Sequence, residues 1–175
     1  MKKISLFFIV FFLALPLGYY SFLYFLPYYI MSEVARRKQL TYNQVYHQSL
    51  PTDASRAIVL PNPDFMYSIV LYDLSQKESL LIQSNLPDSS YWSVGFYDGN
   101  TSNYWVKNDQ QLKSKKVKIL LLLKGKHPPK DIDAANTEVV YAPTPKGIIL
   151  TRLLVLDKKN LSYFDAIQKS FVIVP

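Results

Sequence analysis

Three aspartates could carry acid–base chemistry in this sequence. Asp64, Asp73 and Asp98 each lie at the end of a β-rich run or in a turn. Two carboxylates held at the right separation can hydrolyse a glycosidic bond, and an aromatic ring such as that of Tyr67 or Trp105 could stack on the sugar. Aspartate at the end of a strand also bonds to nearby backbone amides and so fixes a turn, which is the competing structural interpretation.

Other catalytic and metal-binding patterns do not occur in the sequence. The chain has no cysteine and two histidines, His47 and His127, so neither a thiolate site nor a multi-histidine metal site is expected. Its five glycines form no G-x-G-x-x-G or P-loop motif, and no G-x-S-x-G motif is present. We therefore predict no metal and no cofactor, and we lean towards a protein that is not an enzyme. For His47, a role as ligand or base competes with that of a partly exposed residue near the first apolar segment.

Two stretches gather polar side chains that could either fix a turn or bind a ligand. The first is LPNPDFMYS (60–68), and the second is YWSVGFYDGNTSNYW (91–105), an aromatic run followed by a polar turn. Strand alternation puts Trp92, Val94 and Phe96 on one face, which we predict to pack in the core. We also predict that the two turns lie near each other at one end of the β domain. The candidate residues of this ligand site or structural turn are Asn62, Asp64, Tyr67, Asp73, Asp98, Thr101, Asn103 and Trp105.

Short β-rich runs separated by Pro, Asn, Asp and Ser must position these side chains. One late helix is expected in NLSYFDAIQKSF (160–171), with Ser162 and Asp165 as a capping box. The pattern predicts a mainly β fold, an antiparallel β-sandwich or jelly-roll-like domain, with a barrel as the alternative. Strands are expected at 56–60, 66–73, 79–84, 90–98, 103–107, 117–124, 137–142 and 147–156, and in FVIV near the end of the sequence.

The first forty residues predict a transmembrane helix. No charged residue lies between Lys3 and Glu33, and Ile4–Tyr24 provides the ~20 apolar residues that cross a bilayer. This run is longer than the ~7–15 apolar residues of a secretory signal, and no A-x-A-like cleavage site follows it, so an uncleaved signal anchor is favoured. Aromatic side chains crowd its C-terminal end, as at a membrane interface. They are Tyr19, Tyr20, Tyr24, Tyr28 and Tyr29.

The net charge of +7 is concentrated beside this helix. Five of the 20 basic residues and one of the 13 acidic residues flank it, which leaves 15 basic and 12 acidic residues, a net charge of +3, over 39–175. That distribution is typical of a membrane protein, and no nucleic-acid partner is expected. Lys2 and Lys3 favour a cytoplasmic N-terminus, although the basic residues at 36–38 compete with them. We predict a single-pass protein of the bacterial inner membrane with a periplasmic C-terminal domain.

The two polar stretches resemble a bacterial family catalogued as domain of unknown function 1254. Its members carry a segment like R-P-N-x-D-T-x-Y-S, then D-L, then a Tyr-Tyr/Trp strand that ends in D-x-x-T-x-N-aromatic. The resemblance covers about 55–156 and is closest to a short, membrane-anchored branch. Leu60 and Phe65 stand where longer members often have Arg and Thr. The matching residues here are Pro61, Asn62, Asp64, Tyr67, Ser68, Asp73, Leu74, Tyr91, Trp92, Asp98, Thr101, Asn103 and Tyr104.

The resemblance implies a partner but no activity. Longer members continue into a second β domain, numbered 1214 in the same catalogue, so the resemblance implies that a separate polypeptide provides that half.

The domains expected here are a transmembrane anchor at 1–29, a helical neck at 30–50 and a β-rich extracytoplasmic domain at 51–175.

Two functions compete on this reading of the sequence. The first is an uncharacterised membrane-anchored envelope protein, a binding and assembly module that contacts the lipid bilayer and docks a companion β-domain protein. The alternative is a carboxylate-dependent envelope hydrolase or carbohydrate-active protein.

Overall fold

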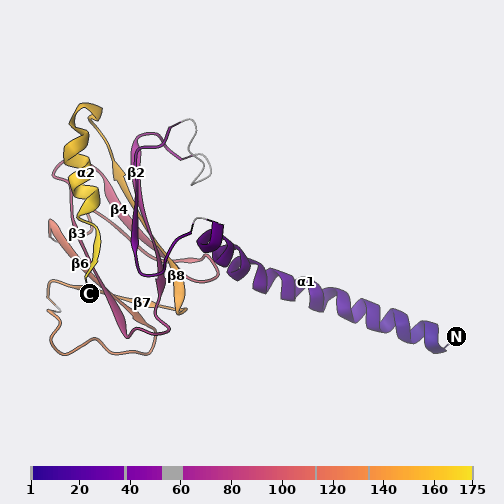
Figure 1. Cartoon of the computed structure of the whole chain (residues 1–175). Coiled ribbons are helices and arrows are strands. Elements are labelled where there is room, and N and C mark those ends of the chain that lie inside the picture. The colour runs from indigo at the N-terminus through magenta and orange to yellow at the C-terminus, as the bar shows by residue number, and fades with distance from the viewer. Residues whose placement is uncertain (1, 38, 53–60, 113, 134, 175) are drawn as a thin grey trace.

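Two β-sheets pack face to face, and a long N-terminal helix projects away from them (Figure 1). A short helix near the C-terminus covers one side of the sheets. This arrangement confirms the mainly β, sandwich-like fold with one late α-helix and a preceding apolar helix. The computed structural model describes residues 2–37, 39–52, 61–112, 114–133 and 135–174, and the strand predicted at 56–60 lies outside them.

The first sheet has five strands, all antiparallel, in the order β1-β2-β8-β4-β5. Its central strand β8 comes from late in the chain and separates β2 from β4, which both pair with it. The strands are β1 (Val45–Gln48), β2 (Phe65–Asp73), β4 (Trp92–Tyr97), β5 (Asn103–Asn108) and β8 (Lys146–Leu154).

The second sheet has four strands in the order β7-β6-β3-β9. Its strands β6 and β7 run parallel, the one departure from an antiparallel arrangement among the described strands. Parallel neighbours need a crossover of a dozen or more residues, and the segment 124–137 provides it. The strands are β3 (Ser79–Asn85), β6 (Lys116–Leu123), β7 (Glu138–Ala142) and β9 (Val172–Val174).

The hydrophobic core lies between the two sheets. Trp92, Val94 and Phe96 of β4 are 1%, 0% and 0% exposed, which confirms the face predicted for them. Alternate residues of the facing sheet, such as Ile82 and Ile119, meet them in the same cluster. The aromatic content of β4 is therefore explained by burial in the core.

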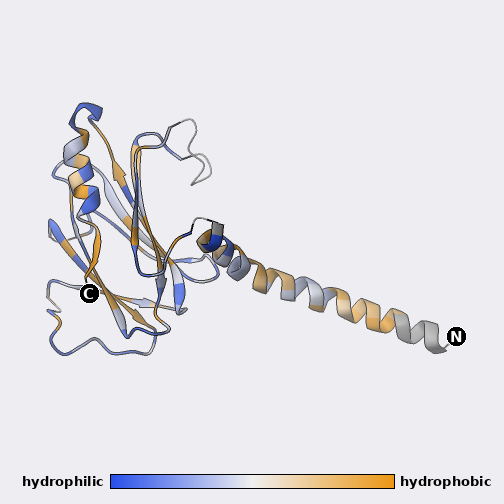
Figure 2. Cartoon of the chain, viewed as in Figure 1, coloured by the Kyte–Doolittle hydropathy of each residue, from blue (hydrophilic) through white to orange (hydrophobic). Residues whose placement is uncertain are grey.

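Helix α1 (Lys2–Arg37) has 36 residues and extends about 54 Å at 1.5 Å per residue. Its side chains from Phe8 to Phe25 are all exposed, and Figure 2 shows hydrophobic residues along the part that projects from the β domain. Phe8–Arg36 has a mean hydropathy of 1.9 and is the one span in the described residues long and apolar enough to cross a membrane. By length and composition it is compatible with a single-pass anchor.

The helical neck predicted at 30–50 is wrong beyond Arg37, where α1 ends. Gln39, just after the helix, has a positive φ of 52°, a conformation that terminates helices, and Val45–Gln48 is strand β1. The amide of Asn43 donates to the carbonyl oxygen of Asp73 (2.9 Å) and accepts from its N–H (2.8 Å). These two bonds hold the segment beside β2, so tertiary contacts override the helical pattern.

Helix α2 (Leu161–Lys169) closes the side of the sandwich where β1 and β9 lie. The buried side chain of Gln168 donates to the carbonyl oxygens of Gln48 (2.8 Å) and Tyr67 (2.9 Å), which ties the helix to β1 and β2. The predicted capping box does not form, because Ser162 lies inside the helix and Asp165 pairs with Lys169. A single turn of 3₁₀-helix, η1 (Lys158–Asn160), precedes α2.

Candidate functional site

The two polar turns lie at opposite ends of the five-stranded sheet. β2 and β4 both pair antiparallel with β8, so they run in the same direction, and the turn before β2 is far from the turn after β4. Val155 N–H donates to the carbonyl oxygen of Asp64 at one end, whereas Tyr97, next to Asp98, pairs with Ile148 at the other. About seven residues separate these levels, or about 23 Å at 3.3 Å per residue. The prediction that the turns lie near each other is wrong.

This separation rules out Asp64 and Asp98 as a catalytic pair. Glycosidases hold their two carboxyl groups about 5–9.5 Å apart, far closer than the ends of the sheet that carry Asp64 and Asp98. Tyr67 is 7% exposed, and Trp105 packs edge-to-face on Phe96 with ring centroids 5.2 Å apart. The geometry does not assemble a carboxylate pair walled by these two rings.

Asp98 builds the turn between β4 and β5. Its side chain is buried, and Oδ1 accepts hydrogen bonds from the N–H groups of Asn100 (3.1 Å) and Ser102 (2.9 Å). Thr101, between them, has a φ of 69°. Asn103 Nδ2 donates to the carbonyl oxygen of Phe96 (3.1 Å) across a register shift in the β4–β5 pair. These contacts determine the backbone path of the turn.

Asp73 shares this end of the sheet and ends β2. Its Oδ1 accepts from Ser75 N–H (2.8 Å), and its Oδ2 lies 3.2 Å from Lys146 Nζ. Partial burial alone would raise the pKa of Asp73, but the hydrogen bonds from Ser75 and the charge of Lys146 outweigh it and lower that pKa. Asp73 is thus held as a carboxylate that anchors the end of β2.

Asn62 and Asp64 form the turn at the opposite end. Asn62 Oδ1 accepts from the N–H of Asp64 (2.9 Å), an Asx turn that leads into β2. The N–H of Asn62 donates to the hydroxyl of Tyr67 (3.2 Å). The carboxylate of Asp64 is half exposed and lies 2.8 Å from Lys158 Nζ.

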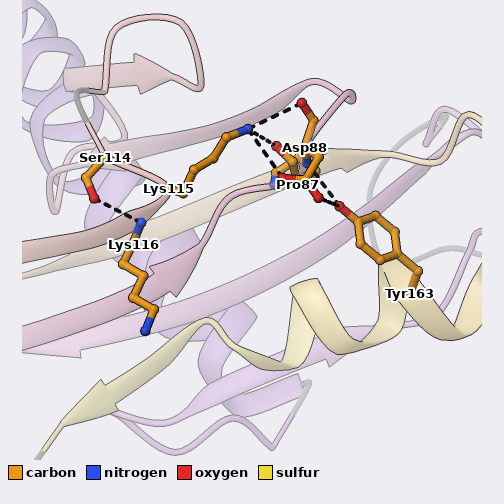
Figure 3. A network of polar contacts seen from close by, with 6 residues as sticks. All are labelled: Pro87, Asp88, Ser114, Lys115, Lys116 and Tyr163. Carbon is orange, nitrogen blue, oxygen red and sulfur yellow. Dashed lines mark hydrogen bonds and ion pairs between the residues drawn. The ribbon is translucent and has the colours of Figure 1, made fainter.

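Polar contacts also join the loops at this end, as Figure 3 shows. Lys115 Nζ donates to the carbonyl oxygens of Pro87 (3.0 Å) and Asp88 (3.3 Å). The N–H of Asp88 donates to the hydroxyl of Tyr163 on α2 (2.9 Å). This network fastens the β3–β4 loop to both α2 and the segment before β6. Within the described residues, no group of three His, Cys, Asp or Glu side chains could hold a metal ion.

A groove with a volume of about 790 Å³ lies between the C-terminal part of α1 and the outer face of the five-stranded sheet. We call it the α1 groove. Of the predicted site residues, Thr101 lines it. Its walls are mainly apolar, with Ile30, Val34, Leu40, Ile69, Ile148 and Leu150 among the lining residues.

A signal for the α1 groove is present in the sequence of β8. Ile149 and Leu153 face the core and are buried, while Ile148 and Leu150 point to the other face of the sheet. A strand that is apolar on both faces indicates a neighbour on each of them. Ile148 and Leu150 were not among the site residues predicted from the sequence.

His47 lies at the edge of the α1 groove and is partly exposed. Its Nδ1 is 3.0 Å from Ser68 Oγ. Burial lowers the pKa of His47, with Asp165 opposing that change and Lys169 adding to it. Because Ser68 is 0% exposed, it cannot reach a substrate, and the pair links β1 to β2 rather than forming a nucleophile and base.

Comparisons with known proteins point to a family and a fold. Residues 42–175 match a family described as "Protein of unknown function (DUF1254)". No curated protein matches the chain. The VPA0106 protein from Vibrio parahaemolyticus is similar in structure, with a TM-score of 0.65 and 11% identity over 84% of this chain and 33% of that one.

A second solved structure, an uncharacterized protein from Burkholderia cenocepacia, has a TM-score of 0.50 and 16% identity over 80% of this chain and 38% of that one. At these identities the likeness shows the fold. The chain spans about a third of the length of the first solved structure and somewhat over a third of the second.

Proposed function

We propose that this chain, which belongs to the DUF1254 family of proteins of unknown function, is a membrane-anchored module that binds a companion β-domain protein. In this proposal, α1 anchors the protein in the bilayer and the sandwich provides the binding surface. The observation that carries it is an open edge of the sandwich, formed by β5 and β7, that exposes apolar side chains.

The open edge brings together the last strand of each sheet. β5 ends the order of one sheet and β7 that of the other, and Lys107 Nζ lies 2.7 Å from Glu138 Oε1 across them. Val106 on β5 is 58% exposed and Tyr141 on β7 is 46% exposed. Edge strands carry unpaired N–H and C=O groups to which a strand of another protein can bond.

The opposite side of the sandwich is covered. There α2 contacts β2 and β3, and Gln168 ties it to β1. The two sides of the sandwich therefore differ, and the side without a covering helix among the described residues is the one we assign to the partner. The two similar solved structures extend well beyond the part that matches this chain, which supports a companion that supplies a further part.

Site-specific photocrosslinking tests this assignment. A photoreactive residue in place of Val106 is expected to crosslink the full-length protein, in its native membrane, to one protein that mass spectrometry identifies as containing a β domain. Leu156, which is 61% exposed in the segment before η1, provides the matched control. Crosslinking at position 156 but not at 106, or a monodisperse monomer without crosslinks at either position, would contradict the proposal.

We further propose that the protein is a single-pass protein of the bacterial inner membrane, with its β domain in the periplasm. Lys2 and Lys3 support a cytoplasmic N-terminus. A C-terminal alkaline phosphatase fusion is expected to be active, and a C-terminal green fluorescent protein fusion to be dark. Fluorescence without phosphatase activity would show the opposite orientation. As a control, replacing Lys2 and Lys3 with acidic residues should weaken the preference for a cytoplasmic N-terminus.

A further inference from the structure

The α1 groove begins where the exposed apolar part of α1 ends. Phe8 to Tyr29 covers 22 residues of α1, about 33 Å at 1.5 Å per residue, which matches a hydrocarbon core of about 30 Å. With this span in the bilayer, Tyr28 and Tyr29 lie at the interface, where tyrosine is favoured. Tyr29 and Ile30 also line the groove, so its wall continues directly from the membrane-facing surface of the helix.

The sheet meets the helix at this same level. A side chain at Gly99, in the β4–β5 turn, would contact the ring of Tyr28, and Met31 is 5% exposed. Figure 1 shows α1 leaving the β domain with its N-terminus far from it. The outer face of the sheet around α1 therefore lies next to the bilayer surface when α1 spans it.

The chemistry of the groove fits a hydrocarbon chain. Ile69, Ile148 and Leu150 form its floor on the sheet, and Val34 on α1 faces them from the other wall. The polar lining residues include Glu33 on α1, His47 and Gln48 on β1, and Thr101 in the β4–β5 turn. A volume of about 790 Å³ lies within the range of about 300–1,000 Å³ typical of sites for small ligands.

We propose that the α1 groove binds an acyl chain of a bilayer phospholipid. The acyl chain leaves the bilayer alongside the tyrosines of α1 and lies against the outer face of β2 and β8, where apolar side chains would otherwise face water. This proposal rests on the membrane anchor and not on the open edge, because none of the groove residues used here lies on β5 or β7.

Photolabelling of the full chain tests the proposal. The protein is reconstituted in vesicles of phosphatidylethanolamine and phosphatidylglycerol that include phosphatidylglycerol with a diazirine in one acyl chain. Labels are expected on peptides that contain Ile69 and Ile148–Leu150 as well as on the span of α1. Val34→Trp places a large side chain in the groove from the helix side. It should reduce labelling of the sheet peptides at least about tenfold, which is the effect expected when two methylene groups of the acyl chain lose their contact with the groove.

Two controls make the outcome decisive. Val172→Trp, at a 41% exposed site on the other sheet, should leave labelling unchanged, and Leu150→Trp repeats the block from the sheet side. Labels confined to α1 in the wild type, or equal labelling in Val34→Trp and Val172→Trp, would overturn the proposal. A parallel arm uses a free fatty acid with the same diazirine, and labelling of the groove by the fatty acid alone would overturn the assignment to a bilayer lipid.

Discussion

Gly147→Ala is expected to lower the thermal midpoint of unfolding by about 6–12 °C. Gly147 opposes Tyr72 in the β2–β8 pair, and a Cβ atom there would overlap the carbonyl oxygen of Tyr97 and the hydroxyl of Tyr72. Tyr72 is fully buried, and its hydroxyl lies 3.2 Å from that of Tyr104, so it has no room to retreat. Overpacking against backbone costs about 3 kcal/mol, and each kcal/mol shifts the midpoint by about 2–4 °C at this size.

Gly95→Ala is the matched control on the neighbouring strand. An added Cβ atom at Gly95 would lie 3.3 Å from a ring carbon of Tyr97 and 3.4 Å from Asn103 Nδ2, side-chain atoms that can shift. Circular dichroism of both variants in the same detergent measures the difference. A Gly147→Ala protein that melts with the wild type would show that β8 does not approach Tyr72 and Tyr97 as described.

Asp98→Ala is expected to destabilise the protein by about 2–4 kcal/mol, because two N–H groups of the turn lose the buried carboxylate that accepts from them. The groups are the N–H of Asn100 and of Ser102. Hydrogen–deuterium exchange is expected to increase in the β4–β5 turn and along β5, which pairs with β4 alone among the described strands.

Asp64→Ala provides the comparison for Asp98. The carboxylate of Asp64 is half exposed, and the ion pair with Lys158 that the variant loses lies at the surface. Such pairs contribute about 0–1 kcal/mol. Equal destabilisation by the two variants would contradict the structural role of Asp98. If the two variants behave as expected, the aspartates of the two polar turns play different structural roles.

Local pattern predicted the strands and the late helix well. Alternation identified the core face of β4, since Trp92, Val94 and Phe96 must all leave water together. The boundaries of β2 and β3 differ by one residue from those expected. The helical prediction for the segment after α1 was wrong. Hydrogen bonds between Asn43 and Asp73, which are 30 positions apart, hold this segment, and local propensity does not include such contacts.

The site was less predictable than the fold because it depends on strand order. Both polar stretches have the residue types that favour turns. The side-chain oxygens of Asp98 and Asn62 accept hydrogen bonds from nearby backbone N–H groups, as is usual in turns. Their separation follows from β8 pairing between β2 and β4, a long-range arrangement that no local pattern specifies. The α1 groove likewise depends on where α1 meets the sheet.

The position of β8 also constrains the order of folding. β2 ends at Asp73 and β4 at Tyr97, but the strand that both of them need as a neighbour begins at Lys146. During synthesis from the N-terminus, these two strands lack their pairing partner, and their apolar faces stay exposed, until β8 has been synthesised. A chain that carries α1 into a membrane first is therefore tethered before its sandwich can close, and its unfinished strands are exposed next to the bilayer during that interval.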